Sequence, residues 1–152
     1  MKKMLMTAAV LGLLASCSGG QSDKDTAAKD SVAVEIPAVV YTGYEKTVPG
    51  DTCLVEISFV IADGDSTGTY ERVQTYTYGQ TGQKVRTGQD GTVTRTTGTK
   101  NDKAALLLTC KKDGEEDKIT YYELATDGSQ IIQLAEDKGR SANWKDYVYT
   151  KK

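Results

Sequence analysis

Four Asp-Gly pairs punctuate the chain and constrain its fold more than any other feature. They are Asp63-Gly64, Asp90-Gly91, Asp113-Gly114 and Asp127-Gly128. An Asp-Gly pair between alternating segments favours a tight β-hairpin, because both residues tolerate a positive φ. The sequence therefore predicts a succession of short strands joined by hairpin turns.

The segments between these pairs have the two-residue period of strands. Val55, Ile57, Phe59 and Ile61 fall on one face of such a segment, with polar residues among those on the other. Beyond the N-terminal apolar segment, no stretch of 12 residues has a convincing helical period. The predicted strands, rich in threonine, tyrosine and valine, are 39–44, 54–61, 69–78, 92–99, 104–110, 118–124, 130–134 and 146–150.

These strands predict an all-β domain over residues 35–152. About eight antiparallel strands in up-and-down order can close into a small lipocalin-like barrel, which removes exposed sheet edges. A half-open barrel and a two-sheet sandwich are the alternatives.

The N-terminus has the form of a bacterial lipoprotein signal peptide, residues 1–16. Lys2 and Lys3 precede an apolar run that ends in Leu14-Ala15-Ser16-Cys17, which matches a lipobox. The run is too short for a membrane span. We expect cleavage before Cys17 and attachment of acyl chains such as palmitate to this residue; the alternative is a plain signal peptide with a coincidental cysteine.

Residues 17–34 are small, polar and charged, so we expect a flexible tether between the lipid and the domain. Two or more long acyl chains give stable anchoring. Ser18, rather than aspartate, follows the cysteine, as in lipoproteins sent to the outer membrane. The expected location is the outer membrane, with the domain in the periplasm or at the cell surface.

The domain resembles the N-terminal domain of NlpE-like lipoproteins, a family associated with copper resistance and envelope-stress signalling. The resemblance rests on Tyr41-Thr42-Gly43, a loop 49–53 ending in Cys53, the apolar strand 54–61, a Thr/Tyr-rich strand, and the closing segments 119–124, 131–134 and 147–149. It implies a β-barrel and a role in sensing envelope stress through a protein partner.

The metal-binding part of the family motif is broken in this chain. Gly50 stands where the family's Pro-Cys-x-x-Cys loop has its first cysteine, which leaves Cys53 alone. A thiolate pair can bind a soft metal, whereas one thiol cannot do so by itself. The chain has no histidine, and its three methionines lie in the signal peptide. We therefore predict no metal, no stoichiometric Cu(I) binding and no cofactor.

Cys53 and Cys110 share strand faces with apolar residues and are expected to point inward. They are either two buried thiols that pack as small hydrophobes or a disulfide, which an oxidising periplasm permits.

Tyrosine is the dominant aromatic residue, with nine copies against one Phe and one Trp. The pairs Tyr76/Tyr78 and Tyr147/Tyr149 are each expected to share a strand face. Aromatic pairing across strands explains such positions. Alternatively, these four rings line a cavity for a sugar or another amphipathic ligand.

Several function classes are disfavoured by composition. Without histidine the chain has no Ser-His-Asp or Cys-His arrangement, so no catalytic residue and no enzyme activity are predicted. With 19 basic and 21 acidic residues and no basic stripe, nucleic acid is not an expected partner. The leading hypothesis is a non-enzymatic, membrane-anchored interaction or stress-sensing module; the alternative is a small-ligand carrier.

Overall fold

The structure is a computed structural model that describes residues 36–152. The predicted signal peptide (1–16), the lipidation site Cys17 and the tether (17–34) lie outside the described residues. Within residues 36–152, no helix has the length and apolarity needed to cross a membrane.

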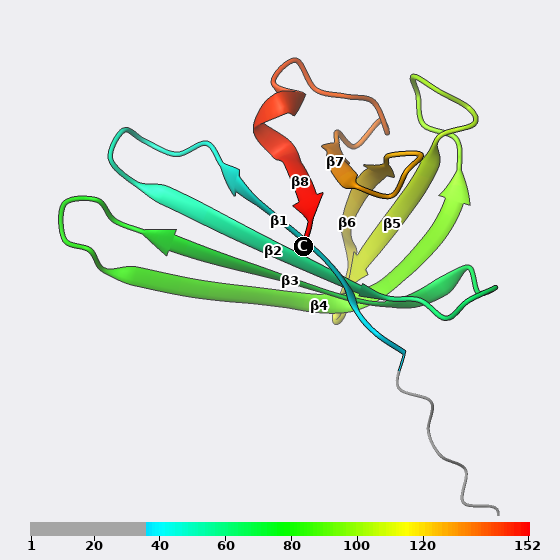
Figure 1. Ribbon diagram of the computed structural model, residues 1–152, viewed down its shortest axis with the longest axis horizontal. Coiled ribbons are helices and arrows are strands. Elements are labelled where there is room, and N and C mark those ends of the chain that lie inside the picture. The colour runs from blue at the N-terminus through cyan, green and yellow to red at the C-terminus, as the bar shows by residue number, and fades with distance from the viewer. Residues whose placement is uncertain (1–35) are drawn as a thin grey trace, which may run out of the picture. The chain divides into compact units, whose positions relative to one another are not determined.

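Eight antiparallel strands form a closed barrel in simple up-and-down order (Figure 1). The strands are β1 (Val39–Glu45), β2 (Thr52–Val60), β3 (Thr67–Thr77), β4 (Lys84–Thr97), β5 (Leu106–Lys112), β6 (Glu115–Leu124), β7 (Gln130–Leu134) and β8 (Val148–Lys151). The predicted all-β fold is confirmed, and closure decides between the barrel and the sandwich. The first and last strands complete the ring through the register Tyr41↔Lys151 and Thr42↔Thr150.

The last strand begins later than predicted. Residues Trp144–Tyr147 form a short 3-10 helix, η1, and β8 starts only at Val148. Tyr147 and Tyr149 therefore do not share a strand, which corrects the predicted pairing of these two residues.

Three of the four Asp-Gly pairs form the predicted turns. Gly64, Gly114 and Gly128 have positive φ between consecutive strands. Asp90-Gly91 was wrongly predicted as a turn, because both residues lie inside β4. The β3–β4 turn lies earlier in the chain, at 78–83, where the amide of Tyr78 donates to the carbonyl of Gln83.

Gly91 is needed for close strand packing rather than for a turn. A Cβ at this position would lie 2.0 Å from the backbone oxygen of Lys111 on β5. A glycine inside a strand can thus mark a close backbone approach as well as a turn.

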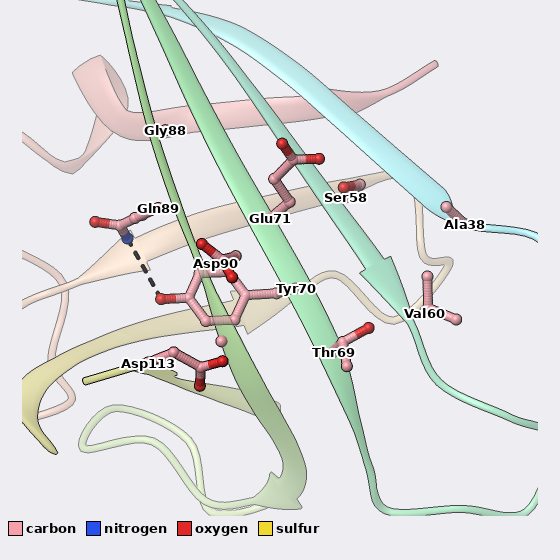
Figure 2. A pocket seen from close by; sticks show the side chains of 11 residues that line it. Ala38, Ser58, Val60, Thr69, Tyr70, Glu71, Gly88, Gln89, Asp90 and Asp113 are labelled. Carbon is pink, nitrogen blue, oxygen red and sulfur yellow. Dashed lines mark hydrogen bonds between the residues drawn. The ribbon is translucent and has the colours of Figure 1, made fainter. Parts of the chain in front are cut away.

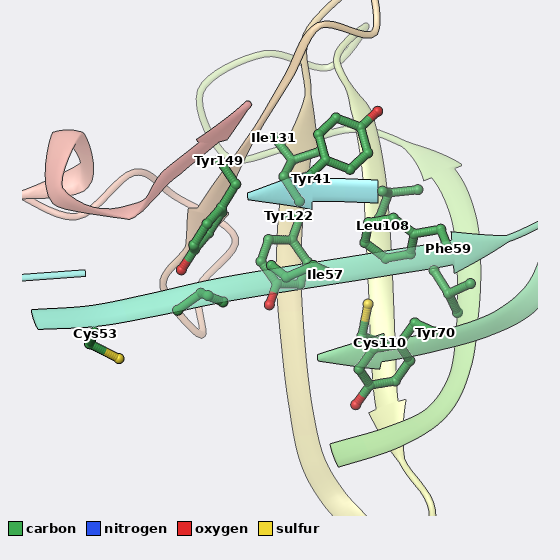
Figure 3. Packing of buried hydrophobic residues seen from close by; sticks show 12 residues of the cluster. Tyr41, Cys53, Ile57, Phe59, Tyr70, Leu108, Cys110, Tyr122, Ile131 and Tyr149 are labelled. Atoms are coloured by element: carbon green, nitrogen blue, oxygen red, sulfur yellow. The ribbon is translucent and has the colours of Figure 1, made fainter. Parts of the chain in front are cut away.

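Apolar and aromatic side chains fill the barrel interior (Figure 3). Tyr122 at its centre is fully buried and makes edge-to-face contacts with Phe59 and Tyr149, with ring centroids 6.2 Å apart in both pairs. The core cluster comprises Tyr41, Cys53, Val55, Ile57, Phe59, Tyr70, Val93, Leu108, Cys110, Tyr122, Ile131 and Tyr149.

The barrel wall is uneven because its strands differ in length. β4 has 14 residues, whereas its neighbour β5 has seven and pairs with β4 only from Gly91 onward. The hairpins β1–β2 and β3–β4 consequently extend beyond the rest of the barrel (Figure 1).

Candidate functional site

A buried polar cluster lies on the inner side of the extended hairpins. The Arg72 guanidinium on β3 contacts the Glu45 carboxylate on β1 at 2.5 Å, and their side chains are 12% and 15% exposed. Gln74 donates to the second oxygen of Glu45 at 3.1 Å, and the Tyr149 hydroxyl donates to the first at 2.6 Å. The cluster joins β1, β3 and β8 inside the barrel.

This cluster neutralises its own charge. The Glu45 carboxylate receives three donors, so the ion pair has the hydrogen bonds that a buried charge requires. Burial and the hydrogen bond to Glu45 raise the pKa of Tyr149 above its ordinary value. Its hydroxyl therefore stays protonated at neutral pH and acts as a donor, which indicates a structural role.

Two buried polar atoms, the Tyr122 hydroxyl and Nε of Arg72, have no hydrogen-bond partner within residues 36–152. Burial raises the pKa of Tyr122 well above its ordinary value, so the phenol stays neutral. Neither residue lines the hollows at the hairpin tips, beside β3 and β4, or at the opposite end of the barrel, which are described below.

Both predicted inward-facing cysteines are buried, and both are free thiols in the structure (Figure 3). Cys53 is on β2 beside Gln74, with Nε2 4.0 Å from Sγ, while Cys110 is on β5 across from Val93. Burial raises the pKa of Cys110 to about 12 and also raises that of Cys53. Neither thiol has the lowered pKa of a reactive cysteine.

The four tyrosines considered as a ligand lining do not line one cavity. Tyr149 belongs to the packed core, and Tyr147 lies in η1. Tyr76 and Tyr78 contact each other edge-to-face, with centroids 4.8 Å apart, at the far end of the β3–β4 hairpin. Of the four, only Tyr78 lines a described hollow.

Asp51 fastens the two hairpin tips together. Its carboxylate accepts from the Tyr76 hydroxyl at 2.5 Å and from the Gly79 amide at 2.8 Å. These bonds lower the pKa of Asp51, and the same contact raises the pKa of Tyr76 to about 12. A Cβ on Gly79 would lie 1.8 Å from the carbonyl oxygen of Gly50, so the tips meet backbone to backbone.

The resulting hairpin-tip surface carries a hollow of about 360 Å³. We define this surface by the lining of the hollow: Val48, Pro49, Asp51, Tyr78, Gln80, Thr81 and Gln83. The five large apolar residues exposed in the described region are Ile36, Tyr44, Val48, Tyr78 and Val85. All except Ile36 belong to or flank the two tips. Exposed apolar groups rimmed by polar ones are typical of interaction sites.

Further hollows lie elsewhere in the described domain, and two of them border core residues. One of about 190 Å³ opens at the opposite end of the barrel, with Phe59 and Leu108 in its apolar lining and Asp63 and Arg95 among its polar residues. The other, about 720 Å³, is open to solvent beside β3 and β4, where Gly88 and Gly91 lack side chains (Figure 2). Gln89 donates to the Tyr70 hydroxyl at its base, at 3.5 Å.

Sequence reasoning missed Glu45, Arg72, Gln74 and Asp51. Arg72 and Gln74 lie on the inward face of β3, together with two tyrosines. Polar residues at such core positions are the sequence signal that could have indicated a buried polar cluster. Their acceptor Glu45 lies 27 residues from Arg72 and has no local signature.

The fold and these contacts define a small, closed, eight-stranded barrel with a filled interior. Comparisons with protein-family models, curated proteins and solved structures found no match for the chain. Over residues 36–152, no group of three or more Cys, Asp or Glu side chains is arranged to hold a metal ion.

Proposed function

We propose that this chain is a lipid-anchored bacterial envelope protein of the NlpE-like type, whose barrel recognises a protein partner without catalysing a reaction. The lipobox at Cys17 supports the anchor, and the filled barrel interior is the observation that carries the recognition role. A packed core leaves the outer surface for binding, and this favours recognition over carriage of a small ligand inside the barrel.

The hairpin-tip surface is the part of the barrel best suited to such recognition. Val48 and Tyr78 are 61% and 43% exposed on a support that Asp51 holds in one arrangement. A backbone that is already held in one arrangement does not have to be ordered on binding, which favours affinity.

The anchor is tested by substitution of its cysteine. We expect Cys17→Ser to lose the label in cells that are grown with labelled palmitate, because the acyl chains would have no attachment point. Cys53→Ser is the matched control and should keep the label. Palmitate label on the Cys17→Ser chain would refute the lipid anchor.

The partner is tested by photocrosslinking in intact cells. A photoreactive amino acid at Val48 should give an adduct of discrete mass with an envelope protein, whereas one at exposed Thr126, on the β6–β7 turn, should not. The yield of this adduct should fall in Asp51→Ala, because this substitution releases the hairpin tips. The recognition role is lost if Val48 gives no adduct and deletion of the gene leaves the envelope-stress response unchanged.

A further inference from the structure

The first half of β4 is an open sheet edge. β4 pairs with β3 from Lys84 to Thr94, but no strand within residues 36–152 pairs with Lys84–Asp90 on the other side. Residues 84–88 and Asp90 are exposed, and Gln89 is half-buried. Figure 1 shows this segment along the outer edge of the extended hairpins. An unpaired edge offers backbone groups that can bind another strand.

The backbone pattern shows which groups are free. The carbonyl of Gln83 accepts from the amide of Tyr78, the residue that follows β3, so in an antiparallel ladder the backbone groups of Val85, Thr87 and Gln89 also face β3. Those of Lys84, Arg86 and Gly88 then face the open edge. The carbonyl of Asp90 also points to this side of β4, where it accepts from the amide of Asp113 at 3.0 Å.

We propose that two copies of this chain associate through this edge, with their β4 strands antiparallel about a two-fold axis at Thr87. In this register the paired segment is Val85–Gln89 of each copy, because Asp113 already bonds to the backbone of Asp90 at that edge. Lys84 lies just beyond the paired segment, on the same outer face as Asp90 of the other copy. Arg86 lies opposite Gly88 and diagonal to Asp90. Opposite charges at diagonal positions stabilise strand pairing, so each Asp90 attracts Arg86 of the second copy.

The two neighbouring registers of the dimer are less favourable, because one pairs like charges and the other collides with β5. An axis at Arg86 places the two Arg86 side chains opposite each other, and like charges at paired positions are destabilising. An axis at Gly88 requires Lys84 to pair with Thr92, whose edge is already occupied by Lys111 of β5. The axis at Thr87 pairs Val85–Gln89 of the two copies, which lie on the free part of the edge.

A single cysteine tests the register in the full chain. The two Thr87 residues form a non-hydrogen-bonded pair on the axis, with Cα atoms about 4.5 Å apart, which suits a disulfide. Oxidation of Thr87→Cys should therefore give a covalent dimer. Lys84→Cys is the matched control on the same edge; its two copies would lie about 20 Å apart and should not crosslink. Oxidation of the unsubstituted chain measures how much covalent dimer the native cysteines form by themselves.

A pair of charge substitutions provides a second measurement without crosslinking. A Cβ on Gly88 meets no atom within 4 Å, so substitution there leaves the fold intact. Gly88→Glu places an acid opposite Arg86 and should tighten the dimer, whereas Gly88→Lys should weaken it. Because each change acts twice at the axis, we expect shifts of about two- to thirtyfold in the dimer dissociation constant, measured by sedimentation of the full chain.

Three outcomes would overturn the proposal. These are the absence of a Thr87→Cys dimer, equal crosslinking by Lys84→Cys, and sedimentation that does not respond to the charge at position 88. None of them bears on the anchor or on the hairpin-tip surface, so the proposed function is tested separately.

Discussion

Arg72 and Glu45 form an ion pair inside the barrel across the intervening strand β2, with 2.5 Å between nitrogen and oxygen. Loss of either partner leaves a charge buried without compensation. Arg72→Met or Glu45→Leu alone should each lower the free energy of unfolding by about 3–5 kcal/mol, as measured in urea. The double variant should recover most of this loss, because apolar side chains can fill the same space. Additive losses in the double variant would contradict the ion-pair account.

The Tyr149 hydroxyl should contribute to stability through its bond to Glu45. Tyr149→Phe removes a hydrogen bond to a charged group and should cost about 1.5–3 kcal/mol. Tyr147→Phe is the control, since no side-chain hydrogen bond of Tyr147 is present within residues 36–152; its effect should stay within about 0.5 kcal/mol. Equal effects of the two substitutions in the same urea titration would argue against the contact with Glu45.

The Asp51 contact should make the hairpin tips sensitive to pH at both extremes. The folded pKa of Asp51 is lowered, so its contribution is complete above the ordinary value of 3.8 and is lost as the pH falls toward the folded value. The pKa of Tyr76 is raised to about 12, so its contribution is complete below 10 and is lost as the pH rises through 12.

Amide exchange at Gly79 reports on this contact directly, because this amide donates to Asp51. After correction for the intrinsic pH dependence of exchange, its protection should decrease in acid. In Asp51→Asn, which keeps an acceptor but no charge, protection should be lower at neutral pH and insensitive to acid. Asp63→Asn, in the β2–β3 turn, is the control and should behave as the unsubstituted chain does.

Alanine substitutions at Gly91 and Gly88 should have very different effects on stability, although the two residues are only three positions apart on β4. In Gly91→Ala the new methyl group would lie 2.0 Å from the Lys111 oxygen, so β4 and β5 must separate at a cost of about 1–3 kcal/mol. Gly88→Ala meets no neighbour within 4 Å and should be neutral or stabilise by about 0.5 kcal/mol. Thermal unfolding of the two variants measures the difference, and similar melting temperatures would contradict the close approach at Gly91.

The cysteines should react with thiol reagents only after unfolding. Burial raises the pKa of both thiols and shields them from reagent, so Cys53 and Cys110 should label slowly in the native domain. In denaturant without reductant, both should label rapidly. Mass spectrometry counts the adducts, and two unreactive cysteines in the denatured chain would instead indicate a disulfide.

Much of the local structure could be predicted from sequence, because its signals are short-range. The alternation at Val55, Ile57 and Phe59 identified the inner face of β2, and three Asp-Gly pairs identified turns. The same logic failed at Asp90-Gly91, because the close approach of Lys111 comes from a different strand. Local propensity does not report such a contact.

The sequence by itself determined the all-β class, most strand faces and the inward direction of both cysteines, since each depends on neighbours a few positions apart. Only the tertiary structure decided that the barrel closes, that Glu45 meets Arg72, and that Lys84–Asp90 has no neighbouring strand in the described domain. These features depend on the relative register and length of strands distant in the chain. A two-residue period shows which face a side chain occupies, but not which residue lies across from it.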